Sequence, residues 1–237
     1  ELGGKLYEED GTCRINSPEG IEAFKKYCAL YKDGYAPQDA INWGYTEMVQ
    51  GFTSGLSGIL NQTSEVVATC EDSMEDGTWT TIPFPRASDG NIYSKADSYY
   101  MAMSNQSKNK DEAWRFIEFM LEPENNRKLS EACLFIPVME GAENDPRFTE
   151  GGMKGFVDSM NDPTFIREPF YGYFPELGEF METFYDAEVQ KYLLGQQTAE
   201  ESINISDYLT TAQQKFMQES PDTPIPTSVR TDGSEVK

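Results

Sequence analysis

Hydrophobic residues recur at helical spacing in several stretches of the chain, and the clearest of these follows a short apolar run. A helix over 110–121 would collect six apolar side chains on one broad face: Ala113, Trp114, Phe116, Ile117, Met120 and Leu121. Asn109 stands at its N-cap position with Glu112 three residues later, which is the spacing of a capping box, and Pro123 ends the helix. The apolar run Tyr99–Met103 comes just before, so the pattern predicts a strand that feeds a helix, half of a βαβ unit.

Similar signals predict the other elements. Ser17 and Pro18 begin a helix that Gly34 closes, after a hairpin-like start over residues 3–16. Further helices are predicted over 46–52, 124–133, 153–160, 177–189 and 205–216, and Thr198 with Glu201 forms another capping box. Short strands are predicted over 56–60 and 79–82, whereas residues 221–237 show no apolar period and are expected to be flexible. This helix-rich pattern with a few short strands predicts an α/β fold.

The net charge and the absence of histidine limit which partners and which chemistry the chain can have. The 237 residues hold 41 Asp and Glu against 19 Lys and Arg, a formal charge of -22, and no His. Such a surface repels nucleic-acid backbones and anionic bilayers, so we expect neither as a partner. The absence of His excludes Ser-His-Asp and Cys-His chemistry within the chain and removes the commonest zinc ligand. A pair of carboxylates of the glycosidase kind is still open.

The cysteines and the apolar runs exclude further classes. Four cysteines occur without CxxC spacing, which speaks against a metal knuckle or a redox motif and leaves their pairing open: Cys13, Cys28, Cys70 and Cys133. No run approaches the roughly 18 apolar residues that span a membrane. The chain begins at Glu1 rather than Met, so we expect that a segment upstream has been removed.

Five segments, in this order, resemble family 1 extracellular solute-binding proteins, the carbohydrate-binding group that includes maltose-binding protein. The most specific is Ser107–Phe116, which is similar to the family's S-K-N-K-E-A-A-W-K-F. The others are Gly3–Tyr7 with Ile15–Phe24, Phe52–Ile59, Ile82–Pro85, and Leu193–Ser202. Together they cover almost the whole chain up to about Phe216. One departure is Ser57-Gly58-Ile59, where the family has Ala-Ala-Met, and it suggests looser packing.

The resemblance implies a periplasmic-binding-protein-like (type II) fold of two α/β lobes with a sugar between them. Members are usually longer, so we expect mainly the C-terminal lobe plus a fragment of the N-terminal lobe. Residues 1–88 and 137–220 would belong to the C-terminal lobe, 89–136 would return into the N-terminal lobe, and 221–237 would be a flexible tail. The implied function is capture of a sugar or oligosaccharide for the permease subunits of an ABC importer, with no catalysis and no cofactor. The implied location is extracellular or periplasmic, with an upstream lipid anchor as the membrane attachment.

Sugars are held by aromatic faces against C–H surfaces and by polar groups that read the hydroxyls. The resemblance therefore makes loop residues the candidate ligand contacts: Trp43, Asn61, Gln62, Ser64, Asp97, Ser98, Tyr99, Tyr171, Tyr173 and Phe174. Purely structural roles are also possible for some of them: Trp43 could be a partly buried anchor, and residues 61–64 could form an ordinary polar turn. Phe180, Phe184 and Tyr185 are interpreted as core. The sequence leaves two other functions open: an acidic glycosidase or lyase domain, and a surface interaction module.

Overall fold

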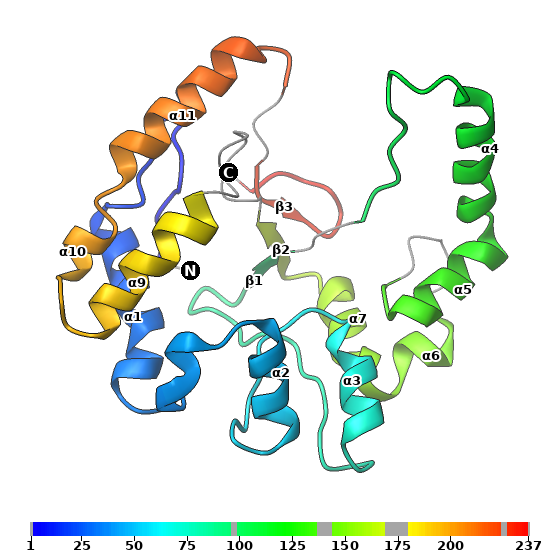
Figure 1. Ribbon diagram of the computed structural model, residues 1–237, viewed down its shortest axis with the longest axis horizontal. Helices are drawn as coiled ribbons and strands as arrows, with labels where there is room; N and C mark the ends of the chain where they lie inside the picture. Colours follow the sequence, from blue (N-terminus) through cyan, green and yellow to red (C-terminus); the bar gives the residue numbers. More distant parts are fainter. Residues whose placement is uncertain (1, 96–98, 137–143, 169–179, 224–226, 237) are drawn as a thin grey trace. The chain divides into compact units, whose positions relative to one another are not determined.

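The structure is a computed structural model that describes residues 2–95, 99–136, 144–168, 180–223 and 227–236 (Figure 1). The chain forms two compact units. Unit 1 comprises Glu1–Met48, Glu168–Ser228 and Glu235–Lys237, and unit 2 comprises Val49–Arg167 and Val229–Ser234. The chain passes between the units within α2 (Tyr45–Thr53), at the end of β2, and on both sides of a short segment near the C-terminus.

Unit 1 is helical. It contains α1 (Pro18–Lys32), η1 (Gln38–Asn42), η4 (Phe180–Tyr185), α9 (Asp186–Leu193), α10 (Ala199–Ser202) and α11 (Ser206–Glu219). One apolar cluster joins Phe24 and Cys28 of α1 to Ala199 and Ile203. A second cluster joins Cys13, Phe180 and Leu209, and therefore attaches the hairpin-like start of the chain to α11. In each of these two clusters, residues from both ends of the sequence pack together.

Unit 2 combines helices with a small sheet. Its helical elements are α3 (Val66–Ser73), α4 (Lys110–Leu121), α5 (Pro123–Cys133), α6 (Pro146–Thr149), η3 (Gly151–Met153) and α7 (Lys154–Asn161). The sheet has the order β1 (Ile92–Lys95), β2 (Phe165–Glu168) and β3 (Val229–Arg230), and β2 pairs antiparallel with β3 through Ile166 and Arg230. Fully buried Val67, Phe148 and Met153 form the main core beneath α3 and α7.

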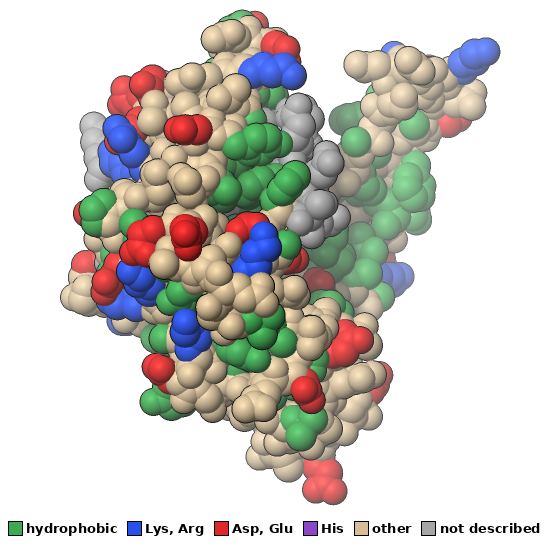
Figure 2. Space-filling model, turned by 60° about the vertical axis from the view of Figure 1, so that its left-hand side comes forward, with side chains coloured by type: hydrophobic (Ala, Val, Ile, Leu, Met, Phe, Trp, Pro, Cys, Tyr) green, Lys and Arg blue, Asp and Glu red, His purple; other side chains and the backbone are tan. Residues whose placement is uncertain are grey.

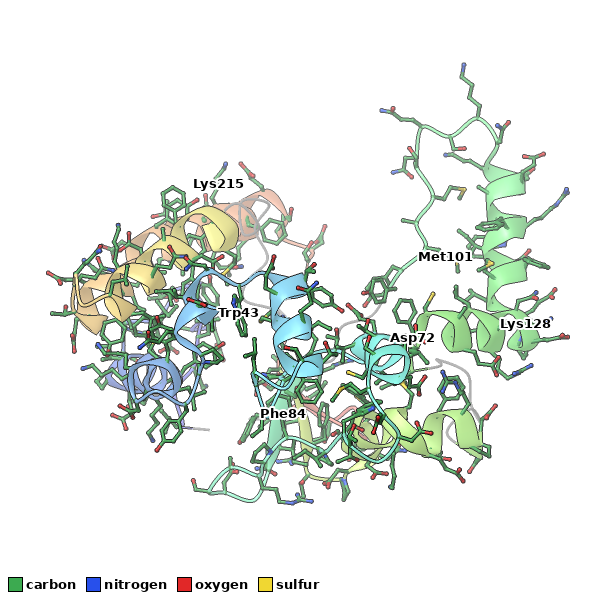
Figure 3. All side chains as sticks on the ribbon, turned by 60° about the horizontal axis from the view of Figure 1, so that its bottom comes forward. Trp43, Asp72, Phe84, Met101, Lys128 and Lys215 are labelled. Atoms are coloured by element: carbon green, nitrogen blue, oxygen red, sulfur yellow. The ribbon has the colours of Figure 1, made fainter. Side chains whose placement is uncertain are left out.

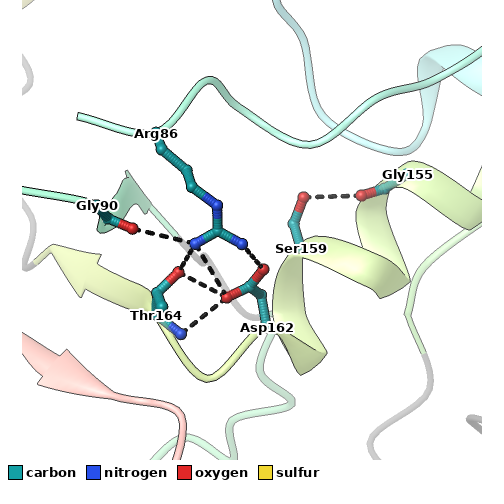
Figure 4. A network of polar contacts seen from close by, with 6 residues as sticks. All are labelled: Arg86, Gly90, Gly155, Ser159, Asp162 and Thr164. Atoms are coloured by element: carbon teal, nitrogen blue, oxygen red, sulfur yellow. Dashed lines mark hydrogen bonds and ion pairs between the residues drawn. The ribbon is translucent and has the colours of Figure 1, made fainter. Parts of the chain in front are cut away.

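A polar network fixes the place where β1 and β2 begin (Figure 4). The Arg86 guanidinium donates to both carboxylate oxygens of Asp162, to Thr164 Oγ1 and to the Gly90 carbonyl oxygen. Asp162 also accepts from the Thr164 backbone N–H at 2.8 Å. Because the Ile92 N–H donates to the Thr164 carbonyl at 3.0 Å, the network holds the turn before β1 against the turn before β2.

Most predicted helices are confirmed. Ser17 caps α1 by accepting from the Gly20 N–H, and Gly34 follows the helix with φ +81°. Thr198 and Glu201 form both bonds of the predicted capping box. The helix predicted over 110–121 has the predicted bounds, and Asn109 is its N-cap residue. The capping box predicted there is wrong, because the Asn109 side chain accepts no capping hydrogen bond.

The predicted strands over 56–60 and 79–82 are wrong, since neither segment pairs as a strand. Leu56 and Ile59 are exposed instead of facing a core. Residues 99–103 likewise have no strand assignment, so the expected strand before α4 is not formed. Strands need a partner, and the short pairings that do form, β1–β2 and β2–β3, join segments far apart in the sequence.

The four cysteines are free thiols. Cys13, Cys28 and Cys70 are buried, each in a different apolar cluster, and Cys133 is half-buried. The structure therefore answers the question that the cysteine spacing left open. In the part of the chain that is described, no helix is long and apolar enough to cross a membrane.

Candidate functional site

The polar loop over residues 61–65 leads directly into α3 in unit 2. Ser64, half-buried, donates its hydroxyl to the Leu134 carbonyl oxygen at 2.7 Å. Val66 and Val67, the next apolar residues, are buried in the core. The loop is thus anchored on one side by the core and on the other by the segment that follows α5.

Leu134 has an unusual backbone. Its φ of 52° and ψ of 38° place it in the left-handed region, which residues other than glycine, and bulky ones above all, rarely adopt. Its side chain is buried in the main core of unit 2, and the bond from Ser64 holds its carbonyl group. These contacts offset the strain, and the sharp turn sets the direction in which Phe135 leaves the helix.

The ring of Phe135 stacks against the ring of Tyr99. The two ring centroids lie 4.3 Å apart at an interplanar angle of 20°, which is a stacked pair. The Tyr99 hydroxyl lies 3.4 Å from Glu65 Oε2. Tyr99 is nevertheless 72% exposed, so most of its side chain is accessible to solvent. We call Ser64, Glu65, Tyr99, Leu134 and Phe135 the Tyr99 cluster.

The Tyr99 cluster has the chemistry of a site for an uncharged, hydroxyl-rich molecule. An aromatic face lies beside a carboxylate, so a ligand C–H surface can stack on the ring while a hydroxyl group donates to Glu65. The Phe135 contact restricts the Tyr99 ring in advance, which lowers the entropy that binding would cost.

The structure brings together two of the predicted ligand contacts, Ser64 and Tyr99, which lie 35 positions apart in the sequence. Gln62 turns back on its own loop, where its side-chain oxygen accepts from the Thr63 N–H at 2.9 Å, and Asn61 is exposed. Trp43 belongs to unit 1, half-buried where η1 leads into α2 (Figure 3). The other candidates lie outside the described residues: Asp97, Ser98, Tyr171, Tyr173 and Phe174.

Sequence reasoning missed Glu65 and Phe135. Glu65 follows the predicted loop by one position, so a wider window would have included it. Phe135 is not among the candidate ligand contacts that the sequence offered. Its closeness to Tyr99 depends on the left-handed backbone of Leu134, for which the sequence carries no signal.

Hydrogen bonds and ion pairs at the surface lower the pKa of several carboxyl groups. Every carboxyl group of the described chain with a resolved shift has a lowered pKa, caused first by a side-chain hydrogen bond: Asp10, Asp89, Glu124, Asp162, Glu188, Glu200 and Asp232. For example, hydrogen bonds from the Tyr93 hydroxyl and then from Asn91 lower the pKa of Asp89 to about 2. On the face in Figure 2, basic side chains are scattered among acidic ones rather than gathered into a patch. The described residues hold no group of three or more Cys, Asp or Glu that could bind a metal ion.

A hollow of about 410 Å³ lies elsewhere, in unit 1. Asp10, Gln214, Met217 and Gln218 line it. None of the predicted ligand contacts belongs to it, and its wide opening makes it a surface depression rather than a binding pocket.

Curated relatives are similar over part of their length. A binding protein of Brucella abortus (strain 2308) is 23% identical over 166 residues, which cover 69% of this chain and 40% of the relative. A binding protein of Brucella suis biovar 1 (strain 1330) gives the same values. The chain therefore spans well under two thirds of the curated relatives it matches.

Solved structures share the fold. An oligosaccharide periplasmic-binding protein from Synechococcus sp. MITs9220 has a TM-score of 0.65 at 17% identity, covering 90% of this chain and 56% of that one. A cyclo/maltodextrin-binding protein complexed with maltotetraose has a TM-score of 0.65 at 17% identity (91% and 54% covered). An ABC transporter solute-binding protein from Thermotoga lettingae TMO, bound with α-D-tagatose, has a TM-score of 0.65 at 19% identity (90% and 54% covered).

These likenesses confirm the periplasmic-binding-protein-like fold that the resemblance implied. The sequence itself matches the family described as bacterial extracellular solute-binding proteins over residues 1–127, more than half of the chain. The chain belongs to this family of bacterial extracellular solute-binding proteins.

Proposed function

We propose that the chain is part of a protein that captures a sugar or oligosaccharide outside the cytoplasmic membrane and delivers it to the permease of an ABC importer. Family membership supports binding rather than catalysis, and two similar structures were solved with maltotetraose and α-D-tagatose. An upstream lipid anchor or a periplasmic location would both keep such a protein near its permease.

The observation that carries the sugar proposal is the Tyr99 cluster. One sugar ring would stack on the exposed part of the Tyr99 ring, and a sugar hydroxyl would donate to Glu65. The formal charge of -22 disfavours anionic ligands, which makes an uncharged one the best match.

The lobe division expected from the resemblance is also part of the proposal. Residues 1–88 and 137–220 would form one lobe, and residues 89–136 would leave it after β1, enter the other lobe and return at Leu134, since β1 and Leu134 belong to the sheet and the core of unit 2. Residues 221–237 would be a tail that is attached to the first lobe by β3. The exposure of α4 supports this, because none of its residues is buried within the described structure and Trp114, Phe116 and Phe119 are more than half exposed. Binding energy would be used to close the lobes, so this chain alone would bind sugar weakly.

Saturation-transfer NMR at millimolar sugar concentration tests the proposal, because that method detects weak binding. A panel that includes maltotetraose and α-D-tagatose is presented to the chain and to the variant Tyr99→Ala. Loss of the stacking face should weaken binding by roughly fivefold to tenfold, the effect of about 1–1.4 kcal/mol. The variant Tyr35→Ala is the matched control, since it removes an exposed ring of unit 1.

Equal binding by Tyr99→Ala and the unaltered chain would contradict the sugar site. A tight one-site isotherm for the unaltered chain in calorimetry would contradict the idea that the cleft is partial. The glycosidase alternative needs a carboxyl group with a raised pKa to act as the acid. The carboxyl groups of the described chain whose pKa departs from its ordinary value are all lowered, so no observation favours that alternative.

A further inference from the structure

Unit 1 carries a row of three aromatic rings whose outer members are open to solvent. Phe180 lies at the start of η4 and is buried, with 3% of its surface exposed. Phe184, at the end of the same element, has its ring centroid 6.4 Å away at 19°, and Tyr208 of α11 lies 5.7 Å away at 22°. Phe184 and Tyr208 are 53% and 47% exposed. Phe184 was interpreted as core from the sequence, and its exposure shows that this was wrong.

The backbone of this segment is irregular. Residues 180–185 form a π-helix, in which a turn contains more residues than in an α-helix. The angular spacing of its side chains therefore differs from that of an α-helix, so a period of 3.6 residues does not predict which of them face the core. Single-turn π-helices are rare and occur frequently at functional sites, so the distortion is itself a sign of use.

Contacts with buried Phe180 also fix the positions of the two outer rings before any ligand binds. Phe180 packs with Cys13 and Leu209 in the core of unit 1, and it contacts both Phe184 and Tyr208. Rings fixed by a buried neighbour lose little entropy when a ligand stacks on them. Exposed Thr211, three residues after Tyr208 on α11, lies on the same side of that helix; its hydroxyl donates to the Asp207 carbonyl oxygen at 2.8 Å and can still accept from a ligand.

We propose that Phe184 and Tyr208 form a second stacking surface, contributed by unit 1, for an uncharged sugar ring. Nucleotide bases also stack on aromatic rings, but their phosphates would meet a chain of formal charge -22. A neutral carbohydrate avoids this repulsion, and its hydroxyl groups suit Tyr208 and Thr211. The inference rests on the proposed function, and it adds a contact surface separate from the Tyr99 cluster.

Calorimetric titration of the 237-residue chain with maltotetraose tests the inference. The ligand concentration must be high, because the expected affinity is low. Phe184→Ala and Tyr208→Ala should each weaken binding by roughly fivefold. Tyr208→Phe keeps the ring and should stay within about twofold of the unaltered chain. Tyr27→Ala, which removes a ring that is 71% exposed on α1, is the matched control and should change nothing.

The outcomes separate this inference from the proposed function. If Tyr99→Ala weakens binding while Phe184→Ala and Tyr208→Ala behave like Tyr27→Ala, the second surface is refuted and the proposed function stands. If maltotetraose and the rest of the sugar panel fail to bind the unaltered chain, both are refuted. Circular dichroism spectra that match the unaltered chain exclude misfolding as the cause of a loss. If Phe184→Ala fails to fold, Phe184→Leu, which keeps apolar bulk without a ring, must still weaken binding.

Discussion

Gly155, in the first turn of α7, is a position where even the smallest side-chain addition should destabilise the fold. A Cβ atom at this position would lie 2.6 Å from Thr81 C and 2.7 Å from both Ile82 N and Thr81 Oγ1. Two of these three atoms are backbone, which cannot rotate away. Thr81 also ties its segment to α7, since its hydroxyl donates to the Gly152 carbonyl at 2.8 Å and accepts from the Gly155 N–H at 3.0 Å.

The magnitude of Gly155→Ala follows from these contacts. Ordinary contact begins at 3.4 Å, so residues 81–82 must retreat by about 0.8 Å (3.4 minus 2.6). Overpacking of this kind costs about 1–3 kcal/mol, and loss of the two Thr81 bonds adds about 2 kcal/mol. Alanine regains about 1 kcal/mol of helix propensity. The variant should therefore be about 2–4 kcal/mol less stable.

Urea unfolding followed by tryptophan fluorescence measures this, because Trp79 packs against the core of unit 2 close to Gly152. The expected change is a fall of about 1 M or more in the urea midpoint. Gly58→Ala is the control, since a Cβ there meets nothing within 4 Å. A Gly155→Ala variant as stable as the unaltered chain would refute the packing of residues 81–82 on α7.

Two further predictions concern polar contacts. Thr198→Ala removes the bond from the Glu201 N–H and should cost about 1 kcal/mol, read as a lower melting temperature, whereas Thr198→Ser should keep it. Bonds from Thr164, then the Arg86 contact, lower the pKa of Asp162 below 3.8, so its contribution to stability is present above that pH and is lost as the pH falls further. Asp162→Asn should therefore lose less of its stability between pH 7 and pH 3 than the unaltered chain in urea unfolding, and an equal loss would contradict the network.

The helices were predictable because their signals are local. Ser17 with Pro18, and Thr198 with Glu201, specify helix starts within four residues, and the structure has both. The sheet was not predictable, because its pairs are distant: Ile166 pairs with Arg230, in a segment that shows no apolar period. The apolar residues over 56–60 predicted a strand, but no partner strand lies beside them in the described structure.

The residues of the candidate site could be predicted only in part. Ser64 and Tyr99 were expected from the family resemblance, while Phe135 was missed because its position follows from the strained backbone of Leu134. Likewise, a regular helical period assigned Phe184 to the core, but residues 180–185 form a π-helix, where that period does not hold, and Phe184 is exposed. Each aromatic surface thus lies beside a departure from regular backbone geometry, which sequence periodicity ignores.

The separate placement of the cysteines has a practical consequence. Because Cys13, Cys28 and Cys70 lie in three different clusters, the topology is complete without any covalent cross-link. Protein purified from a reducing bacterial cytosol, or kept in dithiothreitol, should therefore have the same architecture as protein matured under air. Its refolding from urea should need no oxidant and no isomerase.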